Sequence, residues 1–173
     1  MSYREKIIAE IIEWELAMFM ATPNRGGPAS CQERPATFKI MRQMAHSVHN
    51  DEFLDSYLQD LRNAEQEGRN FMIEKYARMD DLIPPLSTSP LIDEIVNAEC
   101  SFMEEAARTN PHIALGHSGG KFPVYLRSEL ETLSERSLEL YAKEIAEARL
   151  QKRNPVLERY NWLENRLSEK DSD

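Results

Sequence analysis

Cysteine and glycine are both scarce in this sequence. Its two cysteines, Cys31 and Cys100, form no CxxC pair and no closely spaced set, which excludes a disulfide framework. Six glycines and few runs of β-branched residues also argue against a fold built on sheets. We therefore expect reduced thiols, a cytoplasmic location and a helical protein.

Long apolar runs are absent, and positive charge is in the minority. No stretch approaches the roughly eighteen apolar residues of a membrane span, and the chain is already amphipathic from Tyr3 onward, so we expect neither a membrane segment nor a secretion signal. The 21 Lys and Arg residues face 30 Asp and Glu residues, which gives a net charge of -9. Nucleic acids and anionic membranes bind basic surfaces, so we expect neither as a partner.

Helix-forming residues are what the chain has in abundance, chiefly Glu, Ala, Leu, Arg and Met. The sequence predicts an all-α fold: a single domain over residues 1–173, built as a compact bundle of about five to six helices, with a polar tail from about residue 168. Apolar periodicity and capping residues predict helices at residues 2–21, 32–49, 51–79 (with a bend at Gly68), 90–109, 124–150 and from 155 onward. Irregular loops are expected at 22–32 and 110–121.

Three charged side chains, Glu15, Lys75 and Glu99, fall where the helical pattern demands apolar residues. At about 100° per residue, each lies at the centre of the apolar stripe of its own helix. An ionised group that is buried alone is costly, so it is paired, neutralised by a shifted pKa, or used in function. We therefore expect these three side chains to face the interior and to mark a site.

Two interpretations of the inward charges are open. In the first, Glu15 and Lys75 form a buried ion pair, or one of them extends along its alkyl stem to the surface. In the second, they line a polar pocket, where apolar surroundings raise the pKa of a Glu and lower that of a Lys. Glu15 or Glu99 would then be a general base, with Lys75 as its electrostatic partner. Both interpretations require Glu15 and Lys75 to lie near each other.

A carboxylate-bridged metal centre is an alternative, because Glu15 and Glu99 lie on separate helices. Such centres also need Glu-x-x-His on two helices, and no inward-facing histidine follows either glutamate at that spacing. His46 and His49 have a ligand-like interval, but the apolar stripe of their helix favours a solvated helix end for them; that stripe comprises Phe38, Met41, Met44, Ala45 and Val48. We predict no metal site and, without a P-loop or GxGxxG motif, no cofactor.

Cys31 stands just before the predicted helix 32–49. Backbone N–H groups at a helix start stabilise an anion, so Cys31 is a candidate covalent participant, with structural packing as the alternative. The segment GRNFMIEKYARM, residues 68–79, is dense in polar groups, and an ordinary solvated face explains only part of it. Arg127, in the predicted helix 124–150, is a candidate for an anion clamp.

Four phrases of the chain together resemble a bacterial family described only as a domain of unknown function. They are IIEWELAMF, ASCQERPATFKIMR, GRNFMIEKYARM and YLRSELETLSERSLELYA. The resemblance runs from Tyr3 to Ala142 and implies no activity, cofactor or partner. Its motifs and the polar segment 68–79 supply our candidate ligand contacts, which are Trp14, Gln32, Arg69, Asn70, Tyr76, Arg78, Tyr125 and Arg127.

The function expected from these features is the binding or turnover of a small molecule at a polar site inside a helical bundle. Helices 2–21, 51–79 and 90–109 would form the site, and the loops 22–32 and 110–121 would cover it. A non-enzymatic interaction protein, for example a homodimer, is the alternative, in which the inward charges only fix packing. A carboxylate-bridged metal protein is a second alternative.

Overall fold

The computed structural model describes residues 1–23, 34–115 and 120–171 of the chain. Within these ranges the protein is all-α, as its sequence predicts, and has no strand. The described residues form nine helices, more than the expected five or six. They are α1 Tyr3–Met20, α2 Pro35–His46, α3 Asp51–Gln66, α4 Phe71–Met79, α5 Pro90–Thr109, α6 Pro111–Leu115, α7 Lys121–Leu130, α8 Glu135–Leu150 and α9 Pro155–Asp171.

The extra helices arise because two predicted helices are each divided. The predicted helix 51–79 ends at Gln66, where Gly68 takes a left-handed backbone conformation with φ of 70°, and Asn70 caps a new helix by accepting from the backbone N–H groups of Met72 and Ile73. The predicted helix 124–150 divides at Ser134, which caps α8. The short α6 lies inside the expected loop 110–121.

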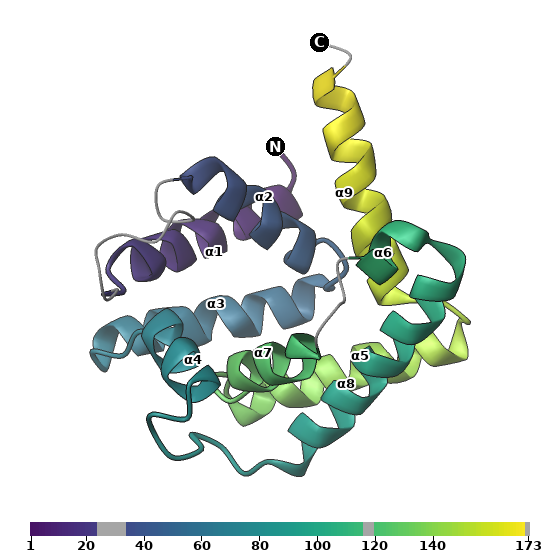
Figure 1. Ribbon diagram of the computed structural model, residues 1–173. Coiled ribbons are helices and arrows are strands. Elements are labelled where there is room, and N and C mark those ends of the chain that lie inside the picture. The colour runs from purple at the N-terminus through teal and green to yellow at the C-terminus, as the bar shows by residue number, and fades with distance from the viewer. Residues whose placement is uncertain (24–33, 116–119, 172–173) are drawn as a thin grey trace.

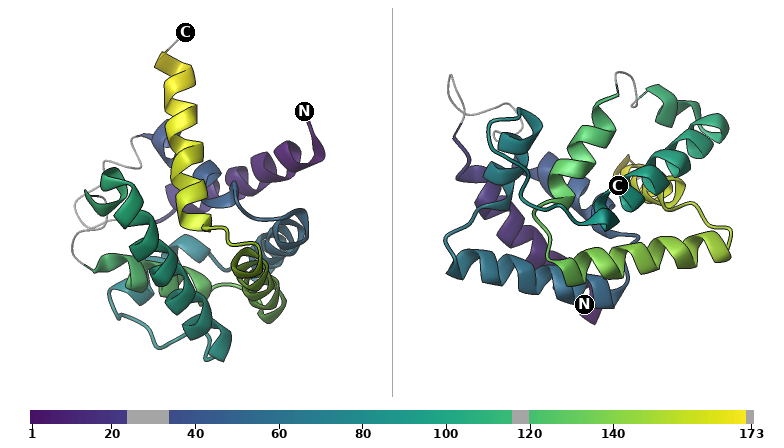
Figure 2. Two further views of the ribbon diagram at one scale, coloured as in Figure 1. Left: turned by 90° about the vertical axis from the view of Figure 1, so that its right-hand side faces the viewer. Right: turned by 90° about the horizontal axis from the view of Figure 1, so that it is seen from below.

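The helices pack around one apolar core. α1 packs against α3 and α2, while α5 packs against α7, α8 and α9. Figure 1 shows α1 and α3 side by side; α3 also packs against α8, and α7 packs against α4 and α5. The left view of Figure 2 shows α9 leaving this body and projecting away from it. Among the described helices, none is long and apolar enough to cross a membrane.

Helix α2 turns polar side chains toward the interior. Its buried residues are Arg42 and His46, one helical turn apart. The prediction of an apolar stripe there is wrong in part: Met41 is 43% exposed, and Phe38 is only partly buried, stacked on Phe19. The reason lies in the neighbouring helix α1, whose buried carboxylate needs cationic and N–H partners.

Candidate functional site

Glu15, in the middle of α1, is fully buried and saturated with hydrogen-bond donors. Arg42 donates to it through Nε and Nη2, at 3.2 and 2.7 Å. The hydroxyl of Tyr57 donates at 2.7 Å, and Nε2 of His46 lies 3.1 Å away. Arg42 also donates to Glu129 of α7 at 2.6 Å. These residues form the Glu15 cluster: Glu15, Arg42, His46, Tyr57 and Glu129.

The Glu15 cluster holds Glu15 in its ionised form. Burial alone would raise the pKa of this carboxyl, but the charge of Arg42 and the contact with His46 outweigh burial and hold the pKa well below its usual value. Burial and the Glu15 charge raise the pKa of the Tyr57 phenol, so Tyr57 stays a neutral donor. The sequence-based expectation of a raised glutamate pKa is therefore wrong at Glu15, because the cations beside it dominate.

Lys75 is buried as expected, but its contacts differ from those expected. Its Nζ donates to the Tyr125 hydroxyl at 3.1 Å and lies over the rings of Tyr125 and Tyr76, at 4.4 and 5.4 Å from their centroids. Burial lowers the pKa of this ammonium, yet the nearby Glu129 raises it above its usual value. In the described part of the chain, the cation that pairs with Glu15 is thus Arg42, and Lys75 interacts with the same cluster chiefly through the charge of Glu129.

Glu99 of α5 forms a second buried centre. The Tyr141 hydroxyl donates to it at 2.8 Å, and both terminal nitrogens of Arg159, from α9, donate to its oxygens. Burial raises the pKa of Glu99, but the Arg159 guanidinium brings it below the usual value. These residues form the Glu99 cluster: Glu99, Tyr141 and Arg159. Its cation comes from the last helix, more than fifty residues away in sequence.

A cavity of about 280 Å³ lies between the two clusters. Arg42, His46, Tyr57 and Glu129 contribute to its wall from the Glu15 cluster, and Tyr141 and Arg159 from the Glu99 cluster. The rest of the wall is mostly apolar or aromatic; it comprises Met41, Met44, Ala45, His49, Phe53, Met103, Phe122, Tyr125, Leu126, Leu130, Leu133, Val156 and Tyr160. The site is therefore an apolar chamber between two neutralised ion pairs.

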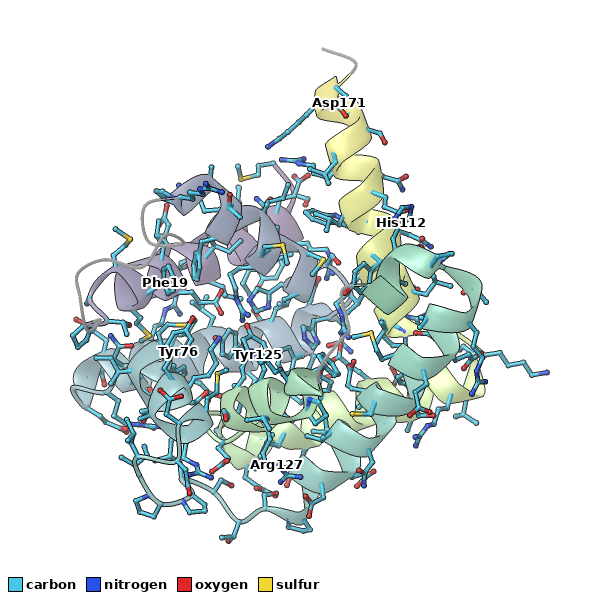
Figure 3. The ribbon with its side chains drawn as sticks, viewed as in Figure 1. Phe19, Tyr76, His112, Tyr125, Arg127 and Asp171 are labelled. Atoms are coloured by element: carbon cyan, nitrogen blue, oxygen red, sulfur yellow. The ribbon has the colours of Figure 1, made fainter. Side chains whose placement is uncertain are left out.

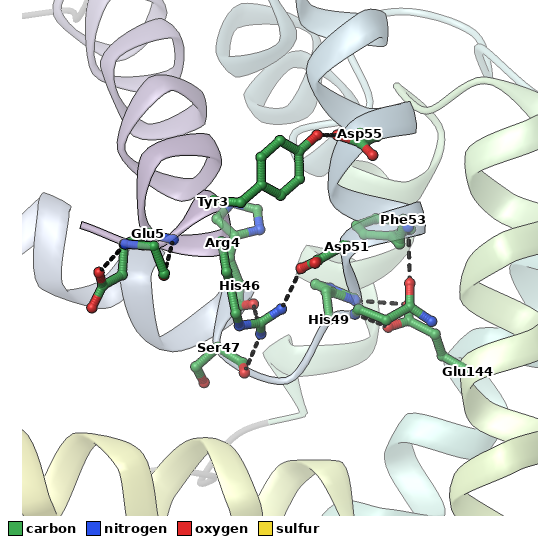
Figure 4. A network of polar contacts seen from close by, with 12 residues as sticks. Tyr3, Arg4, Glu5, His46, Ser47, His49, Asp51, Phe53, Asp55 and Glu144 are labelled. Carbon is green, nitrogen blue, oxygen red and sulfur yellow. Dashed lines mark hydrogen bonds and ion pairs between the residues drawn. The ribbon is translucent and has the colours of Figure 1, made fainter.

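His46, the last residue of α2, and His49, just after it, are both buried. The expectation of a solvated helix end is therefore wrong. Nδ1 of His49 lies 2.9 Å from Glu144, which also accepts from the backbone N–H of Asn50 (Figure 4). Arg4 from α1 donates to the carbonyl of Ser47 at 2.7 Å and fixes the same turn. The end of α2 is thus held against α1 and α8, and both imidazoles face the interior.

Of the candidate ligand contacts in the described ranges, Tyr125 alone lines the cavity. Figure 3 shows Tyr125 on the inner side of α7 and Arg127 on its outer side, where Arg127 pairs with the exposed Asp93. Tyr76 lies beside Lys75, and Trp14 is partly buried against the core.

The polar residues of the segment 68–79 make contacts within the fold. Arg69 pairs with Glu74, and Asn70 caps α4 and donates to the carbonyl of Met18. Arg78 donates to Glu131 and to the carbonyl of Ile83. Cys31 and Gln32 lie outside the described residues.

The cavity residues that sequence reasoning missed are chiefly Arg42, His46, Tyr57, Glu129 and Arg159. A signal for two of them was present: Arg42 and His46 lie one turn apart on one face of a helix that follows a helix with an inward glutamate. A buried carboxylate requires donors, and an arginine and a histidine on one face of the next helix were candidates for that role. No local sequence signal marks Arg159, because its pairing with Glu99 depends on how α9 packs against α5.

The carboxylate-bridged metal alternative finds no matching geometry in the described ranges. Glu15 and Glu99 belong to separate clusters, and an arginine and a tyrosine bind each of them. Across residues 1–23, 34–115 and 120–171, no group of three or more His, Cys, Asp or Glu side chains is placed to hold a metal ion.

Comparison with known proteins gives a family. The family described as "Protein of unknown function (DUF4125)" matches residues 5–172, so the chain belongs to it. The match includes the last helix, which the resemblance seen in the sequence did not reach. No curated protein and no solved structure matches the chain.

Proposed function

We propose that this member of the family binds a small, uncharged and largely apolar molecule in the cavity between the Glu15 and Glu99 clusters. The observation that carries the proposal is the cavity itself, whose volume of about 280 Å³ is close to the lower end of the ~300–1,000 Å³ range of small-molecule sites. Its wall combines apolar and aromatic side chains with a few fixed polar groups, as ligand sites do.

The charge balance of the wall supports an uncharged ligand. Arg42 is neutralised by Glu15 and Glu129, and Lys75 lies in the field of the same Glu129. Arg159 is neutralised by Glu99. A charged ligand would enter a chamber whose ions are already paired, and burying a charge without a counterion is costly.

The apolar wall supports a ligand with an aliphatic or aromatic body. Phe53, Met103, Leu126 and Leu130 come from α3, α5 and α7 and face the chamber together. Methionine adapts to ligands of different shape, and aromatic rings add favourable contacts with apolar molecules. Cavities lined largely by apolar side chains can bind small hydrocarbons even when they did not evolve for them.

Toluene therefore serves as the probe of the chamber. We expect it to shift the methyl NMR resonances of Met44 and Met103, both of which line the cavity, with saturable behaviour. Ala45→Leu adds volume at a partly buried wall position and should abolish the shifts. Ala36→Leu, on an exposed position of the same helix, is the matched control and should behave like the wild type.

Two results would overturn the proposal. One is the absence of any saturable shift in the wild type. The other is an equal shift in the Ala45→Leu variant, which would place toluene elsewhere on the protein.

A further inference from the structure

His46 carries the one buried side-chain nitrogen or oxygen that lacks a hydrogen-bond partner among the described residues. That atom is Nδ1. The ring is 3% exposed and forms part of the cavity wall, where it also packs against the ring of Tyr57. Buried polar atoms in folded proteins are nearly always paired, so an unpaired one on a side chain of the cavity wall calls for a partner from outside the described residues.

The neighbours of His46 fix which kind of group Nδ1 requires. Glu15 is ionised and can only accept hydrogen bonds, so Nε2 of His46 must carry the hydrogen that points at it, 3.1 Å away. Burial lowers the pKa of His46, so the ring is neutral at pH 7 and carries no second hydrogen. Nδ1 is therefore a bare lone pair, which accepts a hydrogen bond and donates none.

Four other polar groups of the wall are already committed to carboxylates. Arg42 and Tyr57 donate to Glu15, and Tyr141 and Arg159 donate to Glu99. The Glu15 carboxylate also polarises the imidazole through the Nε2 hydrogen bond, which strengthens Nδ1 as an acceptor. The position is thus prepared for a donor that the described protein does not supply.

We propose that the ligand carries a hydroxyl or N–H group and that this group donates a hydrogen bond to Nδ1 of His46. The ligand class is then an uncharged phenol, alcohol or N–H heterocycle with an apolar body. This inference rests on the proposed function, since it assigns one polar contact within the same cavity.

Three probes of similar shape separate the inference from the proposed function. Toluene has no polar group, 4-methylanisole has only an acceptor, and p-cresol has a hydroxyl donor. In NMR titrations of the wild type we expect p-cresol to bind about tenfold more tightly than the other two, as one added hydrogen bond of ordinary strength predicts. His46→Phe should remove this preference, while His112→Phe, at an exposed histidine, should keep it.

A second measurement does not depend on a variant that might be unstable. The ¹⁵N resonance of His46 Nδ1 in the wild type should have the position of a free lone pair, and p-cresol should move it toward the hydrogen-bonded position while toluene leaves it unchanged. Equal binding of all three probes, with an unmoved Nδ1 resonance, would overturn the inference and leave the proposed function standing.

Two further outcomes also decide the matter. An Nδ1 resonance that is already hydrogen-bonded in the free protein, and that p-cresol does not change, would show that water fills the position and would overturn the inference. If none of the three probes binds, the proposed function and the inference fall together.

Discussion

At the scale of single residues, the Glu15 carboxylate determines what substitutions around it cost. Both of its oxygens accept hydrogen bonds, and neither has contact with water. Removing one partner of such a buried pair leaves an uncompensated charge, whereas removing both partners does not. The pair with Arg42 is therefore a case in which the double substitution should be milder than loss of Arg42 alone, since Arg42 keeps Glu129 as a counterion when only Glu15 is removed.

We predict that Arg42→Met lowers the free energy of unfolding by about 3 to 5 kcal/mol, because it leaves Glu15 ionised without its guanidinium. Adding Glu15→Met should recover part of this loss, since the double variant no longer buries the Glu15 charge, while Glu129, whose side chain is 21% exposed, still lacks Arg42. Urea unfolding of the wild type, both single variants and the double variant gives the coupling.

The matched control for this cycle is the exposed pair between Arg62 and Glu10, whose side chains are 47% and 42% exposed. Methionine substitutions there should change stability by less than about 1 kcal/mol, because water screens the charges. Additive effects of Arg42→Met and Glu15→Met would contradict the assignment of Arg42 as the partner of Glu15.

At the scale of helices, the C-terminal ends of α3, α4 and α8 share one hydrogen-bond pattern. The residue in the left-handed position differs among the three. The N–H groups of Arg69, Leu82 and Arg153 each donate to the carbonyl five residues back, at 2.8 Å. This pattern requires a left-handed residue just before the donor, which is Gly68 in the first case and Asp81 and Lys152 in the others. A residue with a Cβ pays about 1–2 kcal/mol for that conformation.

We predict that Lys152→Gly stabilises the protein by about 1 kcal/mol, because it removes this strain at an exposed position. Gly68→Ala should destabilise the protein by a similar amount, since it introduces the same strain. Thermal unfolding measures both changes, and Lys152→Ala, which keeps a Cβ, should lie within about 0.5 kcal/mol of the wild type. Destabilisation by Lys152→Gly would show that its side chain contributes more than strain.

Local signals account for the helix ends that the sequence predicted well. Asn50 caps α3, and Ser89 with Pro90 starts α5, so these helices begin at residues 51 and 90 as predicted, because each cap is made within its own turn. The division between α7 and α8 was not foreseen, since it also depends on Asp60 of α3, which accepts from the backbone N–H of Ser134 and from the Ser137 hydroxyl. Contacts of this kind depend on which helices pack together and cannot be read from the spacing of residues in the sequence.

At the scale of the whole molecule, the same distinction separates what could be predicted of the site from what could not. Burial of Glu15, Lys75 and Glu99 is confirmed, at 0%, 3% and 1% exposure, because periodicity alone determines which face of a helix points inward. The partners Arg42 and Arg159 could not be assigned, since pairing depends on which helices pack together.

The docking of α9 links the Glu99 cluster to the shape of the molecule. Within α9, Pro155 and Val156 are buried and residues 157–160 are partly buried, while the C-terminal part of the helix projects outward (Figures 1 and 2). Arg159 binds Glu99, and Asn154, just before the helix, donates to the carbonyl of Phe102 at 2.8 Å. The same first turns of α9 form part of the cavity wall through Val156, Arg159 and Tyr160.

We predict that Glu99→Gln destabilises the protein by about 3 to 5 kcal/mol, because it leaves Arg159 partly buried without a counterion. The loss of hydrogen-exchange protection should be largest in the first turns of α9, whose docking depends on that pair. Asp93→Asn, on the exposed face of the same helix α5, is the control and should leave the protection of α9 unchanged. Unaltered protection of α9 in Glu99→Gln would show that apolar contacts alone hold this helix.

The buried pair of Glu15 and Arg42 also constrains how the family can diverge. A protein that loses Arg42 first keeps Glu15 buried and ionised without its guanidinium. This lowers the free energy of unfolding by about 3 to 5 kcal/mol, out of roughly 5–15 kcal/mol for an ordinary domain. Few populations pass through such an intermediate, while simultaneous loss of both charges is rare. Positions 15 and 42 are therefore expected to covary among relatives as a unit, either both charged or both apolar, and mixed pairs should be found only where another substitution supplies the missing charge.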